Sequence, residues 1–164
     1  MNIYTAIDSP IGRLLLHSDG VALTGLYMDV PSRPPRGMDA RSVDEWVEDA
    51  GSGPLPDTIR QLDEYFAGCR RTFDLPLKLH GTEFQQRVWN VLTEIPYGVT
   101  WSYGELAKRI DNPNASRAVG LANGRNPISI LVPCHRVIGA DGSLTGYGGG
   151  LARKQWLLAH EGLH

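Results

Sequence analysis

The sequence has few cysteines and no long apolar run. Only Cys69 and Cys134 occur in 164 residues, which is too few for a disulfide scaffold and favours a reducing compartment. No apolar stretch approaches the ~20 residues that cross a bilayer, so we expect no membrane partner. Residues 1–4 contain no basic segment followed by an apolar one, so we expect no signal peptide. Together these absences predict a cytoplasmic protein.

The sequence also has little net charge and no metal-ligand spacing. The overall charge of −2 argues weakly against a nucleic acid partner, but residues 1–80 carry −4 and residues 81–164 carry +2. A basic face on the second half is what a polyanion would need, although such a face is more often just solvated surface. A zinc site needs about four ligands, and the two cysteines and five histidines show no such spacing. We therefore expect no bound metal.

The first half predicts a small sheet domain. Apolar segments at 13–18 and 21–27 flank Asp19-Gly20, which is a strong hairpin signal. Residues 31–56 are rich in proline and acids and predict a long surface loop, with a short helix near 43–47. A helix over 58–67 capped by Asp57, and an extended segment over 73–79, complete an N-terminal α/β domain that we place at residues 1–79. We expect this domain to be structural.

The second half, residues 80–164, predicts a mainly helical domain, so the fold class is α+β. Helices are expected over residues 83–93, 103–110, 115–123 and 151–161, with capping boxes at Thr82 and Ser102 and with Lys154 on the wet face of the last helix. Two short helices joined by a polar turn suggest a helix-turn-helix. The second of them has one arginine and many small residues, which let a backbone approach a surface closely. A packed interior helix remains the alternative for its apolar positions.

A cysteine follows an apolar run in the second half. Residues 128–132 predict a buried strand that Pro133 stops. Cys134 comes next, beside His135 and Arg136. A thiol there can be exposed and can have its pKa lowered by a neighbouring positive charge, which makes a nucleophile. A buried core cysteine is the alternative, and these residues alone leave both open.

The flanking motifs extend the pattern around this cysteine. Pro133-Cys134-His135-Arg136 resembles the active-site signature of the 6-O-alkylguanine-DNA alkyltransferases, the methylated-DNA–protein-cysteine methyltransferases. Further segments match that family in order: Phe84-Gln85-Gln86-Arg87-Val88-Trp89, Ile95-Pro96-Tyr97-Gly98, Ser102-Tyr103-Gly104-Glu105-Leu106-Ala107, Arg117-Ala118-Val119-Gly120, Asn126-Pro127, Gly146-Tyr147-Gly148-Gly149-Gly150 and Leu157-Leu158-Ala159-His160-Glu161-Gly162. The match covers about residues 80–162, and residues 1–79 match only loosely.

The resemblance implies direct DNA repair by a suicidal methyltransferase. The alkyl group of 6-O-alkylguanine, and of 4-O-alkylthymine, would pass irreversibly to Cys134 in a single turnover, after the damaged base rotates out of the duplex. The implied partner is double-stranded DNA containing alkylated guanine, and no metal or cofactor is needed. We expect a monomer, and the resemblance leaves open whether copies cooperate along DNA.

The resemblance also implies roles for single residues. Cys134 would accept the alkyl group, His135 would act as general base through a water, and Glu161 would orient the imidazole. Asn126 would hold the turn that carries the cysteine. The expected DNA contacts are Arg117, which fills the hole left by the base, together with Ser116, Ala118, Gly120, Asn123 and Tyr103. Around the extruded guanine we expect the Tyr103 hydroxyl, the backbone carbonyls of Cys134 and Val137, Tyr147, and the backbone donor of Gly148.

Two other classes of function compete with repair. The first is a helix-turn-helix protein that binds alkylated DNA without chemistry, and Cys134 with His135 and Glu161 counts against it. The second is a cysteine hydrolase or acyltransferase. In that class the catalytic histidine usually comes from a distant part of the sequence, so the adjacent Cys134-His135 pair suits it poorly.

Overall fold

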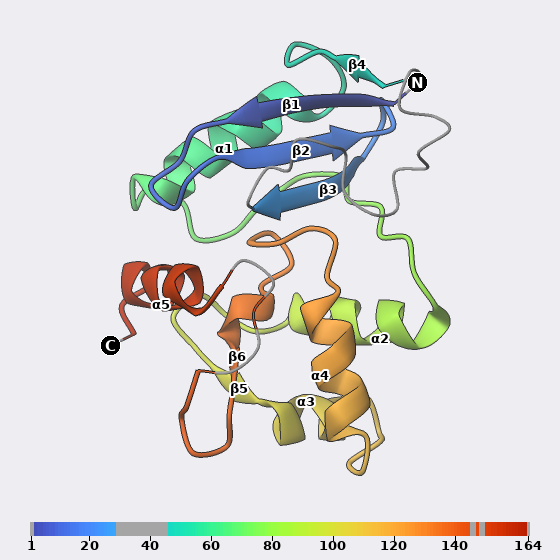
Figure 1. Ribbon diagram of the computed structural model, residues 1–164, viewed down its shortest axis with the longest axis vertical. Helices are drawn as coiled ribbons and strands as arrows, with labels where there is room; N and C mark the ends of the chain where they lie inside the picture. Colours follow the sequence, from blue (N-terminus) through green and yellow to red (C-terminus); the bar gives the residue numbers. More distant parts are fainter. Residues whose placement is uncertain (1, 29–45, 145–146, 148–149, 164) are drawn as a thin grey trace. The chain divides into compact units, whose positions relative to one another are not determined.

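The chain folds into two compact units, Met1–Leu79 and His80–His164, and each is described by itself (Figure 1). The computed structural model describes residues 2–28, 46–144, 147 and 150–163. Its small N-terminal sheet unit and helical C-terminal unit confirm the α+β class. Among the described helices, none is long and apolar enough to cross a membrane.

The N-terminal unit is built on a four-stranded sheet with the order β3-β2-β1-β4. The strands are β1 (Ile3–Ile7), β2 (Leu14–Ser18), β3 (Leu23–Met28) and β4 (Val47–Glu48). The first three run antiparallel, and β4 pairs parallel to β1. The predicted hairpin is present, and the Asp19 carboxylate accepts hydrogen bonds from the backbone of Val21 and Ala22 at 2.9 and 2.8 Å. The short helix expected near 43–47 is wrong at Val47, which lies in β4, and its residues 43–45 lie outside the described residues.

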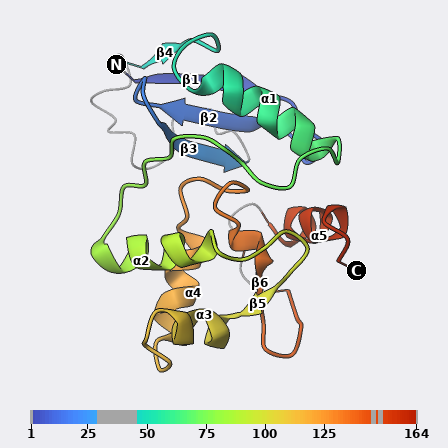
Figure 2. The same cartoon turned by 180° about the vertical axis from the view of Figure 1, so that it is seen from behind.

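One helix, α1 (Leu55–Phe66), covers a face of this sheet, as the two opposite views show (Figures 1 and 2). It begins three residues before the predicted start. Pro56 fits in the first turn because the first helical residues need no intrahelical donor. Asp57 therefore lies inside the first turn and is not the cap.

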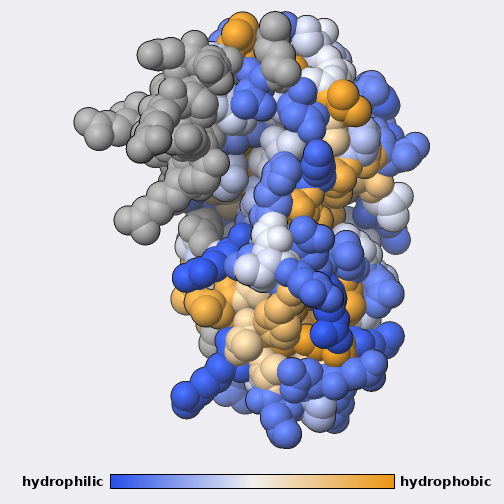
Figure 3. Space-filling view, turned by 90° about the vertical axis from the view of Figure 1, so that its right-hand side faces the viewer, coloured by the Kyte–Doolittle hydropathy of each residue, from blue (hydrophilic) through white to orange (hydrophobic). Residues whose placement is uncertain are grey.

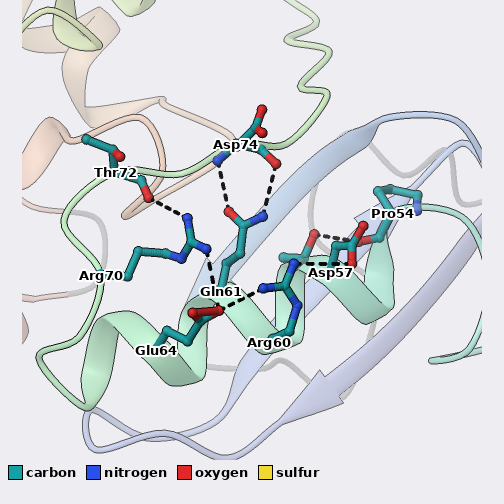
Figure 4. Close-up of polar contacts among 9 residues, drawn as sticks. Pro54, Asp57, Arg60, Gln61, Glu64, Arg70, Thr72 and Asp74 are labelled. Atoms are coloured by element: carbon teal, nitrogen blue, oxygen red, sulfur yellow. Dashed lines mark hydrogen bonds and ion pairs between the residues drawn. The ribbon is translucent and has the colours of Figure 1, made fainter.

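The segment after α1 is tied back to the helix by polar contacts (Figure 4). The Gln61 side chain donates to the carbonyl of Asp74 at 3.0 Å and accepts from its backbone N–H at 2.9 Å. Arg70, which follows the helix, pairs with Glu64 of α1 at 3.5 Å and donates to the carbonyl of Thr72 within the segment at 3.0 Å. These bonds satisfy backbone groups that no strand pairs.

The C-terminal unit contains four α-helices, a short 3-10 helix and a two-stranded parallel ladder among its described residues. The helices are α2 (Glu83–Leu92), α3 (Tyr103–Arg109), α4 (Ser116–Gly124) and α5 (Leu151–His160), and the strands are β5 (Trp101–Ser102) and β6 (Val137–Ile138). The capping box predicted at Thr82 is present in full. Trp89 of α2 is buried, and its indole N–H donates to the carbonyl of Ala122 in α4 at 2.9 Å.

Helices α3 and α4 pack together as the predicted helix-turn-helix. Ser102 caps α3 by accepting from the backbone of Glu105 at 3.1 Å. The turn between the helices places Asp111 at a φ of 59°, a left-handed conformation that Asp tolerates. Strand β5 runs directly into α3 and pairs with β6, which follows the cysteine segment. The ladder thereby joins the start of the helix-turn-helix to the cysteine segment.

The strand predicted over 128–132 is wrong, because this segment is a series of tight turns. The segment is buried, as expected. However, Ile130 has a φ of 74°, and the N–H of Leu131 bonds to the carbonyl of Ser129 at 2.9 Å. That pattern is typical of a classic γ-turn, which is rare and strained. An apolar β-branched run satisfies burial in either form, so the sequence pattern could not separate a strand from a buried turn.

Candidate active site

Cys134 opens a short 3-10 helix, Cys134–Arg136, directly after a second tight turn. Pro133 has φ −81° and ψ 63°, and the Cys134 N–H donates to the carbonyl of Val132 at 2.8 Å, which is the geometry of an inverse γ-turn. The residue is only 3% exposed. Of the two alternatives that the sequence left open, the structure shows the buried cysteine, because the turns fold it inward.

The surroundings of this thiol are polar despite its burial. Burial raises the pKa of Cys134, and it is the largest influence. A hydrogen bond with the Asn126 side chain, the positive charge of Lys154, and the backbone N–H groups of Cys134 and His135 act in the opposite direction. These neighbouring groups favour the thiolate, whereas burial favours the neutral thiol. A nearby base is therefore needed to remove the proton.

A buried carboxylate lies beside the cysteine turn. Glu161 follows α5 as its C-terminal cap. Its Oε2 lies 2.8 Å from Nε2 of His135, and its Oε1 accepts from Nε of Arg136 at 2.8 Å. A second guanidinium bond, from Nη2 to Oε2 at 3.1 Å, makes the arginine contact bidentate. The side chains of Glu161 and His135 are 0% exposed, so these charges interact with little screening by water.

His135 is held as a neutral imidazole. Burial lowers its pKa most, the hydrogen bond and charge of Glu161 raise it, and the charges of Arg136 and Lys154 lower it further. An ionised carboxylate only accepts hydrogen bonds, so the network assigns the imidazole proton to Nε2. Nδ1 is then an acceptor, and it is buried with no hydrogen-bond partner in the described part of the chain. A buried acceptor without a partner is a suitable base for a nearby proton.

Asn126 lies where the resemblance places a holding residue. Its Nδ2 donates to the carbonyl of Val132 at 2.7 Å, and its Oδ1 accepts from the N–H of Ile128 at 3.0 Å. One side chain therefore bridges both ends of the turn that precedes Cys134. This geometry fits the predicted role of fixing the turn.

Lys154 contradicts its prediction. We expected it on the wet face of the last helix, but it is 0% exposed. Its Nζ donates to the carbonyl of Val137 at 2.5 Å, which is one of the two carbonyls predicted to face the guanine amino group. Burial lowers the pKa of Lys154, and the nearby Cys134 raises it. A buried ammonium is tolerated here because it is hydrogen-bonded and lies near a group that can become an anion.

The outer face of α4 carries most of the predicted DNA contacts. Arg117 and Ala118 are exposed, and Ser116 and Gly120 are partly exposed. Asn123 is wrong as a DNA contact, because it is 1% exposed and its Nδ2 donates to the Cys134 carbonyl at 3.4 Å. On the face seen in Figure 3, apolar side chains gather in the lower half of the view, and hydrophilic side chains surround them.

Two aromatic residues complete the predicted site. The Tyr103 ring lies against α4, and its nearest carbons are 3.6 Å from where a side chain on Gly120 would begin. A small residue at position 120 thus gives Tyr103 room beside the helix. Burial raises the pKa of Tyr147 well above its ordinary value, and a hydrogen bond with the Ser129 side chain acts in the opposite direction. Gly148 lies outside the described residues.

The sequence interpretation missed two residues of this cluster, Arg136 and Lys154. Lys154 had a signal, because it shares helical spacing with Leu157, Leu158 and Glu161, all of which are buried. Arg136 contacts a carboxylate 25 positions away, and no local pattern marks such a pair. Among the described residues, no three His, Cys, Asp or Glu side chains gather as a metal site.

Comparisons with known proteins agree along the whole chain. Residues 83–163 match the family described as 6-O-methylguanine DNA methyltransferase, DNA binding domain, and residues 2–79 match its ribonuclease-like domain. Proteins named Methylated-DNA--protein-cysteine methyltransferase are similar: one from Mycobacterium tuberculosis is 54% identical over 96% of this chain and 91% of its own. Another, from Methanosarcina acetivorans, is 52% identical over 97% of both chains.

Solved structures extend this similarity to the fold. The crystal structure of the Mycobacterium tuberculosis O6-methylguanine methyltransferase has a TM-score of 0.87, at 53% identity, over 98% of this chain and 93% of that one. A crystal structure of the protein called OGT from the same organism, in complex with DNA, has a TM-score of 0.86 at 52% identity over 97% and 92%. The chain therefore belongs to the 6-O-methylguanine DNA methyltransferase family.

Proposed function

We propose that this chain repairs duplex DNA by transferring the alkyl group of 6-O-alkylguanine, and of 4-O-alkylthymine, to Cys134 in one irreversible turnover. One observation carries the proposal. Cys134 lies next to a buried imidazole whose Nε2 is 2.8 Å from a buried carboxylate and whose Nδ1 has no partner among the described residues. The family of the chain, and the related protein crystallised with DNA, support DNA as the partner.

The chemistry follows from this arrangement. His135 takes the thiol proton through a water, while Glu161 stabilises the imidazolium that forms. The thiolate attacks the alkyl carbon, a C–S bond forms, and the bond from that carbon to the guanine oxygen breaks. The electron pair stays on the base, and ring nitrogen N1 gains one proton, which matches the one that His135 removed. The products are a thioether on Cys134 and an ordinary guanine, with no electrons gained or lost.

The reaction ends there because a thioether has no good leaving group. Each chain would therefore act once. One chain supplies every group that the reaction requires, so we propose that a monomer acts at each lesion. We also propose that the protein acts in the cytoplasm.

We propose that α4 brings the lesion to the cysteine. Its exposed small residue Ala118 permits close approach of the backbone to the DNA, while Arg117 occupies the space left by the extruded base. Tyr103, beside Gly120, would crowd the phosphate of the target nucleotide and drive its rotation.

The test is a titration of the protein against a duplex containing one 6-O-methylguanine. We expect one methyl transferred per chain and none for Cys134→Ala. Cys69→Ala is the matched control, because Cys69 is the other cysteine of the chain and is exposed; it should transfer as the wild type does. Tight binding of the duplex without transfer would instead support the non-catalytic helix-turn-helix protein.

A second comparison separates extrusion from chemistry. Arg117→Ala should slow repair of duplex DNA more than reaction with a free 6-O-alkylguanine base, because only the duplex requires extrusion. Equal losses on both substrates would remove Arg117 from that role. Binding should also weaken as salt rises, since phosphate contacts release counterions.

A further inference from the structure

Arg136 is held by several contacts that the proposed proton relay does not use. It is 7% exposed, and four of its contacts fix it in place. Two of its nitrogens bond Glu161 at 2.8 and 3.1 Å, and Nη1 donates to the carbonyl of Ile95 at 2.7 Å. The ring of Tyr97 lies 5.8 Å from its guanidinium carbon. A buried, bidentate guanidinium is a strong and directional partner for a carboxylate.

The buried charges make this contact consequential. The Glu161 carboxylate has two candidate counter-charges, the Arg136 guanidinium and a protonated His135. If Arg136 were absent, the carboxylate would be balanced only by an imidazolium, because an opposite charge in a buried site favours the charged form of its neighbour. An imidazolium has no free lone pair, so it could not remove a proton from the thiol.

We infer that Arg136 is a positioning residue of alkyl transfer: it binds both oxygens of Glu161 and balances their charge, so that His135 stays neutral and presents a free Nδ1. This inference rests on the proposed function. The hydrogen bond between Glu161 and His135 at 2.8 Å is kept, and it still orients the imidazole. The positive charge of Arg136 offsets the negative charge of Glu161, which would otherwise favour a second proton on the ring.

All the charged groups that act on His135 agree with this assignment. Glu161, at the end of α5, raises the pKa of His135, while Arg136 on the same turn and Lys154 within α5 lower it. Cys134 precedes it in the chain and is neutral until its proton is taken. Removing Arg136 takes away one of the two positive charges that lower the pKa of His135, while Glu161 still raises it, so that pKa should rise.

The test is the pH profile of single-turnover alkyl transfer to wild type, Arg136→Met and Arg136→Lys, with the modified duplex in excess. The rate falls at low pH where the general base becomes protonated, so this acid limb of the profile reports the pKa of the base. Arg136→Met should move that limb to higher pH by about one unit. Transfer at pH values below the limb should then be roughly tenfold slower than in the wild type, and the wild-type rate should return at alkaline pH. Arg136→Lys keeps the charge and should leave the limb near its wild-type position.

Arg87→Met is the matched control, because Arg87 also holds a backbone carbonyl, that of Ile110 at 2.5 Å, without a carboxylate partner in the described contacts. It should leave the limb in place. If Arg136→Met does not fold, Arg136→Gln takes its place, because glutamine can still donate a hydrogen bond to Glu161 but carries no charge, and its limb should also lie at higher pH.

The outcomes separate this inference from the proposed function. A wild-type chain that transfers no alkyl group overturns the proposed function itself. If the wild type transfers, but Arg136→Met, or Arg136→Gln in its place, is slowed by the same factor at every pH, then Arg136 only anchors the fold and the inference is wrong.

Discussion

The strained turn before Cys134 predicts whether glycine or alanine is the more stable substitute for one of its isoleucines. Ile130 has a φ of 74°, whereas Ile128, two residues earlier, is not among the residues with positive φ. Both side chains are buried, at 1% and 0% exposure. Substituting either isoleucine by alanine should destabilise the protein by about 2–5 kcal/mol, because buried packing contacts are lost. This shared loss makes Ile128 a matched control for Ile130.

The step from alanine to glycine then separates the two positions. At Ile128, glycine should be less stable than alanine by about 0.5–1 kcal/mol, because it loses more backbone freedom on folding. At Ile130, the left-handed backbone costs an L-residue about 1–2 kcal/mol, which glycine avoids. After glycine's own entropy loss is subtracted, Ile130→Gly should be more stable than Ile130→Ala by roughly 0.5–1 kcal/mol.

Chemical denaturation of the four variants, followed by far-UV circular dichroism, measures these differences. A stability change of 1 kcal/mol shifts the melting temperature of a domain of 60–100 residues by roughly 4–8 °C, so thermal melts give a second readout. If alanine is more stable than glycine at both positions, Ile130 carries no backbone strain, and the turn described before Cys134 is wrong.

Three further predictions concern other parts of the molecule. Lys154→Met should raise the pKa of Cys134, because it removes a positive charge that favours the thiolate, and should slow alkylation by iodoacetamide roughly tenfold at neutral pH but much less at alkaline pH. His17 is buried, and burial lowers its pKa from 6.5 to about 4. The folded state therefore resists protonation, so up to about 3 kcal/mol of the stability present above pH 6.5 should be lost as the pH falls toward 4. His17→Leu should flatten that pH dependence in denaturation curves. Thr82→Ala removes the capping box of α2 and should cost about 1 kcal/mol in the same assay, with no change in the rate of alkyl transfer per folded chain.

Local patterns in the sequence predicted the elements whose signals are local. The capping box at Thr82 and the turn at Asp19-Gly20 depend on groups within four residues, and both are present. The start of α1 was misplaced because Asp57 is a good cap in isolation, whereas Pro54 and Pro56 allow the helix to begin earlier. Lys154 was expected on the wet face from its residue type, although its spacing from the buried Leu157 and Leu158 is the better guide. Asn123 was expected to contact DNA from the resemblance, but it is buried.

Contacts between distant residues were beyond local patterns. The apolar run over 128–132 predicts burial correctly, but Asn126 closes it into a turn through bonds to both ends. The pairing of His135 with Glu161 came only from the resemblance to a known family. The second bond to Glu161, from Arg136, was not predicted, because a buried ion pair leaves no periodic signal in either segment.

Cys134 is the permanent acceptor of the alkyl group in the proposed reaction. The most direct test is peptide mass mapping after the protein reacts with an excess of duplex carrying 6-O-methylguanine. We expect one added methyl group, confined to the peptide that contains Cys134, and unchanged after a second dose of substrate. A methyl group on Cys69 or elsewhere, or continued release of methylated product with Cys134 unmodified, would contradict the account.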